Sequence, residues 1–167
     1  MARPTHVSVA VGLPLVILGE AGRFWAAGYL KKLSTLTTAG PYALCRNPIY
    51  VSTFLACAGF LLICNRPLVC IAGAVLFWVL HGGAVIYEET LLSRKFGEQY
   101  AQYRACVPRF LPRLRGPSGE GRFSLRQLVS NNEHLGLAAA AALLLIFGLN
   151  AWSSGRSPIG WLVSLKP

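Results

Sequence analysis

The chain has 167 residues, of which 54% are hydrophobic and only 13% are charged, and its formal net charge is +10. Soluble domains usually carry about 25% charged residues, so this composition argues against an ordinary soluble domain. The basic residues flank long apolar segments and form no stripe with interleaved aromatic residues, so no nucleic-acid partner is expected. The length suits one unit, and we predict a single all-α integral membrane domain over residues 1–167.

The first apolar segment covers residues 7–30 and ends at a pair of lysines. About 24 helical residues at 1.5 Å each are long enough to cross a hydrocarbon core of about 30 Å with some tilt. The first half of the segment, preceded by Arg3, also has the length of a signal-peptide core. Glu20 and Arg23 are three residues apart inside the segment, so they share a helical face and are expected to pair.

Three further membrane spans are predicted, over residues 49–64, 68–87 and 135–152. A tight Asn-Arg-Pro turn separates the second span from the third. A polar, basic stretch over residues 88–134 separates the third span from the fourth. This stretch is predicted to hold a cytoplasmic amphipathic helix followed by a loop.

The distribution of lysine and arginine predicts how the chain lies in the membrane. Eleven of these residues lie between the first and second spans or between the third and fourth, and four lie on the opposite side. Because basic loops stay in the cytoplasm, we predict an integral membrane protein whose basic loops are cytoplasmic. The five cysteines form no C-x-x-C pair, so reduced thiols are favoured over a disulfide or a metal site, and no metal is predicted.

The predicted cytoplasmic helix has one apolar face and two adjacent carboxylates at its start. On a helix with 100° per residue, an arc of about 80° collects Leu92, Phe96, Tyr100, Tyr103 and Val107. Glu89 falls inside that arc, and Glu88 lies just outside it. One interpretation is a surface helix that rests on the bilayer. The other is that the two carboxylates, which would be costly to bury without partners, hold a cation.

The stretch "GPYALCRNPIY" (residues 40–50) places polar residues at the start of the second span. Gly40 begins a turn, and Pro48 suits the first turn of a helix, where its missing N–H costs nothing. Arg46 and Asn47 would then lie beside the unpaired N–H groups of that helix and its positive dipole end. They could bind a polar or anionic group there, or they could be an ordinary interfacial arginine and an asparagine cap.

This stretch and "EETLLSRKFGEQYAQYRACVPRFLP" (residues 88–112) together resemble the paired signatures of the integral-membrane methyltransferases. That family includes isoprenylcysteine carboxyl methyltransferase and the phospholipid N-methyltransferases. The residues that match the first signature are Gly40, Tyr42, Arg46, Pro48 and Tyr50. Those that match the second are Glu88, Glu89, Leu92, Phe96, Gly97, Tyr100, Tyr103, Val107 and Pro108. The resemblance covers residues 19–113, and the two motifs at this spacing, between apolar spans, are specific together.

The resemblance implies an all-α membrane fold of about four spans that binds S-adenosylmethionine in a cytoplasmic pocket, roofed by the helix after the double Glu. The cofactor-binding residues that it implies are Gly40, Tyr42, Asn47, Pro48, Tyr50, Glu88, Glu89, Tyr100 and Tyr103, and the catalytic residues are Arg46 and Glu89. A glutamate could neutralise the sulfonium or the ammonium of the cofactor, and Arg46 could bind its carboxylate. Many members carry His where this chain has Asn47, which cannot titrate, so a binding role is expected there rather than proton transfer.

The reaction implied by the resemblance is methyl transfer to a lipophilic or small acceptor at the cytoplasmic interface, among membrane lipids. Isoprenylcysteine enzymes carry an arginine at a position that corresponds to Ala84 here. A lipid amine, a thiol or another neutral nucleophile is therefore expected as the acceptor, rather than a prenylcysteine carboxylate. Two other interpretations stay open. One is a non-enzymatic small membrane subunit, and the other is a reductase-type membrane enzyme of related fold that uses a nicotinamide cofactor.

Overall fold

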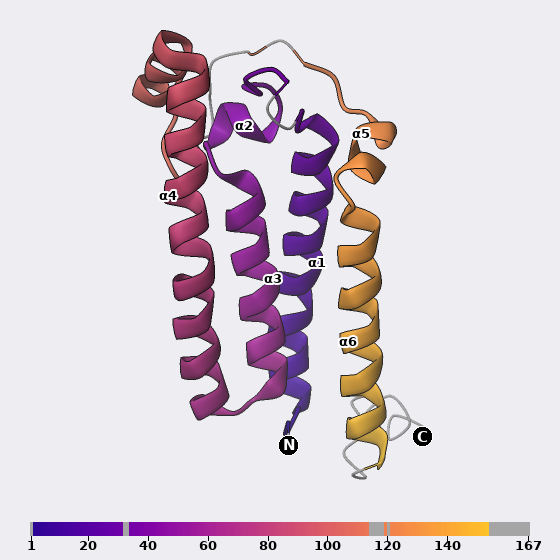
Figure 1. Ribbon diagram of the computed structural model, residues 1–167. Coiled ribbons are helices and arrows are strands. Elements are labelled where there is room, and N and C mark those ends of the chain that lie inside the picture. Colours follow the sequence, from indigo (N-terminus) through magenta and orange to yellow (C-terminus); the bar gives the residue numbers. More distant parts are fainter. Residues whose placement is uncertain (1, 32–33, 114–118, 120, 154–167) are drawn as a thin grey trace.

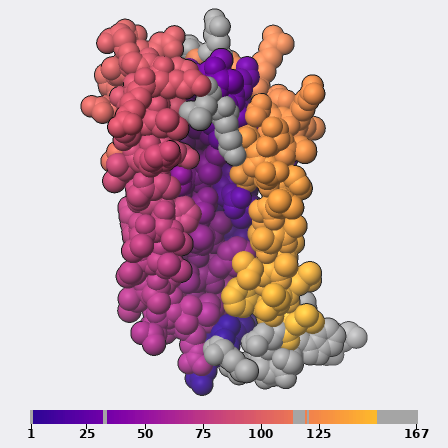
Figure 2. All heavy atoms as spheres, viewed as in Figure 1, coloured from indigo at the N-terminus to yellow at the C-terminus, as the bar shows by residue number. Residues whose placement is uncertain are grey.

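The computed structural model describes residues 2–31, 34–113, 119 and 121–153, with side chains as far as Leu149, and these residues form helices and no strand (Figure 1). The helices are α1 (His6–Tyr29), α2 (Pro41–Leu44), α3 (Pro48–Cys64), α4 (Pro67–Cys106), α5 (Leu125–Ser130) and α6 (Glu133–Ser153). The prediction of a helical chain is confirmed. Figure 2 shows α4 and α6 as the two flanks of the molecule, with α1 and α3 visible between them.

Two of the described helices, α1 and α4, are long and apolar enough to cross a membrane, and α3 and Glu133–Leu149 of α6 are shorter apolar helices. Large apolar side chains lie exposed on the outer faces, for example Leu68 and Ile71 on α4 and Leu145 on α6. So much exposed apolar surface suits lipid rather than water. The chain is therefore a helical membrane protein, whereas the four-span topology and its orientation remain predictions.

Small residues allow α1 and α3 to approach closely. A Cβ atom at Gly12 would lie 2.6 Å from the carbonyl oxygen of Gly59, and one at Gly19 would collide with the backbone of Ala56. Such small-residue contacts are typical of helices that pack inside membranes. Because the two helices are antiparallel, the C-terminal end of α1 lies beside the N-terminal end of α3 (Figure 1).

Helix α4 differs from the sequence-based expectation of a span followed by a separate helix. Its start at Pro67 follows Asn65 in the left-handed conformation (φ 51°, ψ 49°), which agrees with the predicted turn. The helix then continues without a boundary at residues 87 and 88, as far as Cys106. The residues from Pro67 to the position before Gly97, where the helical backbone is interrupted, number 30 and are about 45 Å long, which exceeds a hydrocarbon core of about 30 Å, so part of α4 extends beyond the bilayer.

The actual break in α4 lies at Gly97, whose backbone (φ 48°, ψ −118°) is readily adopted only by glycine. The chain turns there, which brings the last part of the helix back toward the rest of the molecule. Three buried residues of this last part, Tyr100, Tyr103 and Val107, then pack together and against Leu36, Leu92 and Phe96. The predicted apolar face therefore forms, but it is buried against the protein itself.

Polar contacts join α6 and its preceding turn to α1. The carboxamide of Asn131 donates to the carbonyl oxygen of Ala27 at 2.8 Å, near the end of α1, where helix carbonyls lack helical partners. The guanidinium of Arg23 lies 2.7 Å from Glu133 of α6 and 3.5 Å from Glu20. The predicted pair of Glu20 and Arg23 is confirmed, and it extends to α6.

Candidate active site

A cavity of about 240 Å³ lies among the ends of α1 and α3, the middle of α4 and the turn before α6. The residues from the two sequence motifs that line it are Tyr42, Arg46, Asn47, Pro48, Tyr50, Glu88, Glu89, Leu92, Tyr100 and Tyr103. The fold thus brings the two motifs to one place. Other lining residues, such as Leu36, Asn131 and Glu133, lie outside both motifs, and only tertiary packing reveals them.

Gly40 is the one predicted site residue that does not line this cavity. It precedes α2 with φ 60° and ψ −130°, and a Cβ atom there would lie 2.8 Å from the ring of Tyr29. Both the backbone conformation and the close ring explain why a glycine is needed at this turn. Its contribution is to direct the following motif toward the cavity.

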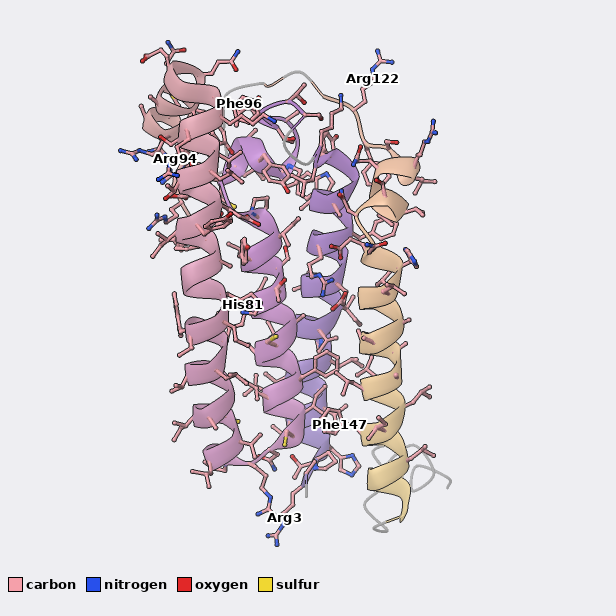
Figure 3. All side chains as sticks on the ribbon, in the orientation of Figure 1. Arg3, His81, Arg94, Phe96, Arg122 and Phe147 are labelled. Atoms are coloured by element: carbon pink, nitrogen blue, oxygen red, sulfur yellow. The ribbon has the colours of Figure 1, made fainter. Side chains whose placement is uncertain are left out.

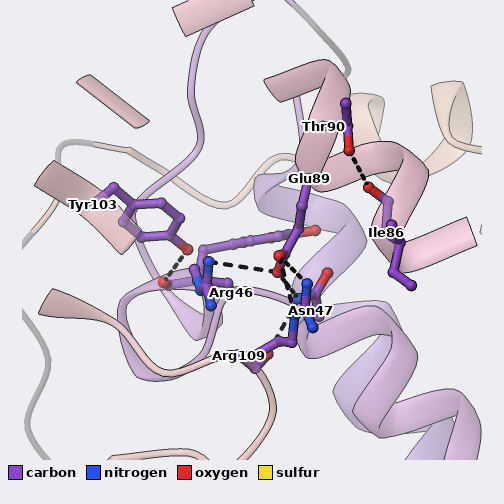
Figure 4. A network of polar contacts seen from close by, with 8 residues as sticks. Arg46, Asn47, Ile86, Glu89, Thr90, Tyr103 and Arg109 are labelled. Carbon is purple, nitrogen blue, oxygen red and sulfur yellow. Dashed lines mark hydrogen bonds and ion pairs between the residues drawn. The ribbon is translucent and has the colours of Figure 1, made fainter. Parts of the chain in front are cut away.

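Glu89 is the centre of the polar network in the cavity wall (Figure 4). Its side chain accepts two hydrogen bonds from Arg109, from Nε at 3.0 Å and from Nη2 at 2.6 Å, and one from Nδ2 of Asn47 at 2.9 Å. Nη1 of Arg46 lies 3.6 Å from Oε1 of Glu89, the oxygen that accepts from Asn47, whereas Arg109 donates to Oε2. Although Glu89 is only 8% exposed, two guanidinium groups and an amide hold it in the ionised form.

Residues 107–113, which we call the strap, cross the N-terminal end of α3 after α4 ends. The carbonyl oxygen of Pro108 accepts from the backbone N–H of Arg46 at 2.8 Å, and that of Arg109 accepts from Nδ2 of Asn47 at 3.2 Å. The N–H of Arg113 donates to the carbonyl of Leu44 at 3.0 Å. These bonds hold the strap against the first motif and deliver Arg109 to Glu89.

The residues that match the two motifs do not include Arg109, so the sequence analysis did not single it out. The contact with Glu89 raises the pKa of Arg109, and its side chain remains 44% exposed. The sequence signal for it is its place two residues beyond Val107, at the end of the second motif. Its partner could not be inferred from periodicity, because Pro108 ends any helical pattern before it.

Buried polar atoms without partners mark the cavity wall. The hydroxyl of Tyr100 and the Nε and Nη1 atoms of Arg46 make no hydrogen bond to any of the described residues. Buried donors of this kind are normally satisfied, and each one left open costs free energy. Nη1 of Arg46 still lies 3.6 Å from Glu89, so the hydroxyl of Tyr100 and Nε of Arg46 are the atoms of these two cavity-lining residues left without a polar partner.

Tyr103 and Tyr42, which also line the cavity, make a contact that holds two parts of the fold together. The hydroxyl of Tyr103 donates to the carbonyl oxygen of Tyr42 at 2.7 Å and so fixes α2 to the returning end of α4. Burial raises the pKa of Tyr42 well above its usual value, so its phenol stays neutral. Neither group is arranged to exchange a proton with a ligand.

The start of α3 adds a second feature suited to anions. Asn47 is the N-cap residue, but its side chain points to Glu89 and does not cap the helix, and Pro48 occupies the first turn as predicted. The first N–H groups of this helix therefore lack a side-chain cap, and they lie on the wall of the same cavity. Helix N-termini favour negative groups.

A second, apolar cavity of about 300 Å³ lies between α3 and α4 and is closed on one side by the strap. Its walls are mainly aromatic and aliphatic, and Tyr50 lines both this cavity and the polar one. The two cavities are therefore neighbours that share one side chain. Among the described residues no three His, Cys, Asp or Glu side chains are grouped as a metal site would require, and the five cysteines are unpaired.

Comparisons with known proteins agree with this arrangement. The family described as phospholipid methyltransferase matches residues 9–99. A protein-S-isoprenylcysteine O-methyltransferase from Mus musculus is 33% identical over 119 residues, which cover 64% of this chain and 42% of that protein. A second one, from Arabidopsis thaliana, is 34% identical over 115 residues, or 60% of this chain and 57% of that protein.

Proteins named for metal resistance also match the chain. The cobalt-zinc-cadmium resistance protein CzcN from Cupriavidus metallidurans is 33% identical over 119 residues, which cover 70% of this chain and 55% of that protein. The chain thus spans about half the length of the curated relatives it matches first. No solved structure matches the chain.

Proposed function

The chain belongs to the phospholipid methyltransferase family of membrane methyltransferases, and on this premise we propose that it transfers a methyl group from S-adenosylmethionine to a lipophilic or small membrane-partitioning acceptor. The observation that carries the proposal is the meeting of both sequence motifs around one polar cavity. The reaction would take place at the cytoplasmic interface, where the basic loops are predicted to lie.

The residues of the polar cavity fit the charges of this cofactor. Arg46 and the open start of α3 line this cavity and suit the carboxylate of the cofactor. Glu88 and Glu89 suit its two cationic groups, the ammonium and the sulfonium.

When bound, S-adenosylmethionine would supply a methyl group already activated by its sulfonium. What the chain would supply is geometry and a dry site. Asn47 and Arg109 fix the direction of the Glu89 carboxylate, and the strap closes one side of the neighbouring apolar cavity. A binding role for Asn47 agrees with its two hydrogen bonds, since an amide cannot take part in proton transfer.

The apolar cavity is the proposed place of the acceptor. It opens on the α3–α4 side of the molecule, and its lining residues include no arginine, lysine or glutamate. Ala84, which stands where isoprenylcysteine enzymes carry arginine, does not line it either. A carboxylate would be dehydrated there without a countercharge, which supports a neutral nucleophile on an apolar body.

A methyl-transfer assay tests this proposal. The purified protein in lipid should move a labelled methyl group from S-adenosylmethionine to an alkyl thiol or an ethanolamine lipid faster than to a prenylcysteine analogue at equal concentration. Clear preference for the prenylcysteine carboxylate would refute the choice of a neutral acceptor and leave methyl transfer standing. No transfer to any acceptor, together with no binding of the cofactor, would refute the proposal as a whole.

A further inference from the structure

Resting on the methyl transfer proposed above, we propose that His81 is the general base of the reaction and that the acceptor is an apolar thiol in the cavity between α3 and α4. Neither of the two sequence motifs includes this histidine. It lies about two helical turns from Glu88 on α4, at the wall of the apolar cavity.

The composition of the apolar cavity singles out His81. The walls come from α3, from α4 and from the strap, and they include Phe54, Trp78 and Phe110. None of the described lining residues is an arginine, lysine, aspartate or glutamate, and His81 is the only one of them with a basic ring nitrogen. A bound molecule that must lose a proton can therefore give it to only one of these side chains.

His81 lies on α4, on the side toward α3 (Figure 3), and hydrogen bonding and ring contacts fix the orientation of its imidazole. Nδ1 lies 3.1 Å from the carbonyl oxygen of Phe77, one turn earlier on α4. A carbonyl can only accept, so Nδ1 carries the proton and Nε2 is left with a free lone pair. The ring stacks on that of Phe77 with centroids 4.3 Å apart and planes at 14°. Because Nδ1 is tied to the backbone of α4, Nε2 is on the ring edge that faces away from this backbone.

Tyr50 connects this base to the polar cavity. Its ring meets His81 edge to face, with centroids 5.9 Å apart, and it also lines the cavity that holds Glu88 and Glu89. An acceptor whose nucleophilic atom lies beside both rings would therefore be at the boundary of the two cavities. Its apolar body would extend along Phe54 and Trp78, toward the open side between α3 and α4.

A thiol suits these surroundings better than the other nucleophiles. Its S–H group is a weak hydrogen-bonding group and is cheap to dehydrate, whereas an ammonium lipid would enter an apolar cavity with a charge and no partner. In the proposed step the S–H bond breaks and the proton goes to Nε2 of His81. The sulfur electron pair forms the new bond to the methyl carbon, and the bond from that carbon to the sulfonium sulfur breaks, its electron pair remaining on that sulfur.

Replacing the base tests this proposal, with an acceptor that does not need a base as the internal comparison. The variant His81→Asn should retain the wild-type affinity for S-adenosylhomocysteine, because the polar cavity is intact. Its rate with an alkyl thiol at saturating cofactor should fall by about 10²–10⁴-fold, as for other general bases. With a fluorinated aromatic thiol, which is already ionised at neutral pH, the rate should change less than threefold. The exposed His134→Asn is the matched control and should behave as wild type.

The outcomes separate this proposal from the proposed function. Equal losses with the two thiols, no loss with either, or transfer only to amines would overturn the role of His81 and leave cofactor binding untouched. A second measurement does not depend on activity: ¹⁵N spectra of histidine-labelled protein, assigned by difference from His81→Asn, should show His81 with Nδ1 protonated and Nε2 bare. A proton on Nε2 in the resting protein would overturn the proposal as well.

Discussion

The guanidinium of Arg109 donates to one carboxylate oxygen of Glu89 from two nitrogens, at 2.6 and 3.0 Å, so a single ion pair fastens the strap to α4. The strap also closes one side of the apolar cavity. The polar and apolar cavities therefore depend on the same contact. Loss of Arg109 should affect both.

The variant Arg109→Gln should lower the free energy of unfolding by only about 0.5–1 kcal/mol, because its side chain is 44% exposed and the pair is partly screened. It should also weaken binding of S-adenosylhomocysteine several-fold, since Glu89 loses its closest partner. Thermal unfolding and calorimetry in detergent measure the two effects. Arg94→Gln removes an exposed arginine on α4 and is the control. If the two variants have the same stability and the same affinity for S-adenosylhomocysteine, the ion pair of Arg109 with Glu89 does not support the cavities as proposed.

The variant Glu89→Gln should weaken cofactor binding by about 1.5–3 kcal/mol, the cost of losing a charge-assisted contact. Glu98→Gln, on the exposed surface of the same helix, should have little effect. The dissociation constant of S-adenosylhomocysteine is the measurement for both. Small and equal effects of the two substitutions on the dissociation constant would show that Glu89 does not contribute to cofactor binding.

Three substitutions at Asn47 test whether the site needs a hydrogen-bond donor without negative charge at this position. Asn47→Asp places a second carboxylate at the 2.9 Å contact with Glu89, so it should reduce cofactor binding more than Asn47→Ala does. Asn47→His should retain measurable binding because the ring can still donate a hydrogen bond to Glu89. Titrations of the three variants at pH 7.5 give the order, and an Asp variant that binds as well as wild type would contradict the geometry.

The break in α4 predicts opposite effects for two glycines. Gly97→Ala should destabilise the protein by about 1–3 kcal/mol, because its φ of 48° is strained for any residue with a Cβ atom. Gly83→Ala, in the regular part of the same helix and with open space around it, should stabilise by about 0.5–1 kcal/mol. Thermal unfolding midpoints of the two variants compare them directly. A stable Gly97→Ala protein would show that α4 can run straight at this position.

The sequence predicted the parts of the structure that follow from local chemistry. The apolar spacing of Leu92, Tyr100 and Tyr103 predicted an apolar helix face, and Pro48 predicted the start of α3, because periodicity and proline geometry are local properties. The break at Gly97 was not predicted, since a glycine inside a helical pattern is compatible with a regular helix as well as with a kink.

Contacts between residues far apart in the sequence were the other feature that the sequence did not predict. The sequence indicated that Glu88 and Glu89 would need a positive partner, but not that Arg109 would serve Glu89 from the strap. Asn131, which holds the end of α1, belongs to neither motif. Such pairs arise only when helices far apart in the sequence are packed, so no pattern along the chain reveals them.

The measurement that tests the central claim most directly is calorimetric titration of the purified, lipid-embedded protein with S-adenosylhomocysteine, with a nicotinamide dinucleotide titrated in parallel. A methyltransferase built around this polar cavity should bind the first ligand at one site, and at 100 times its dissociation constant should be stabilised by about 2.7 kcal/mol. Glu89→Gln should weaken that binding, and the dinucleotide should give no saturable heat. Binding of the dinucleotide alone, or no binding of S-adenosylhomocysteine at millimolar concentration, would contradict the account.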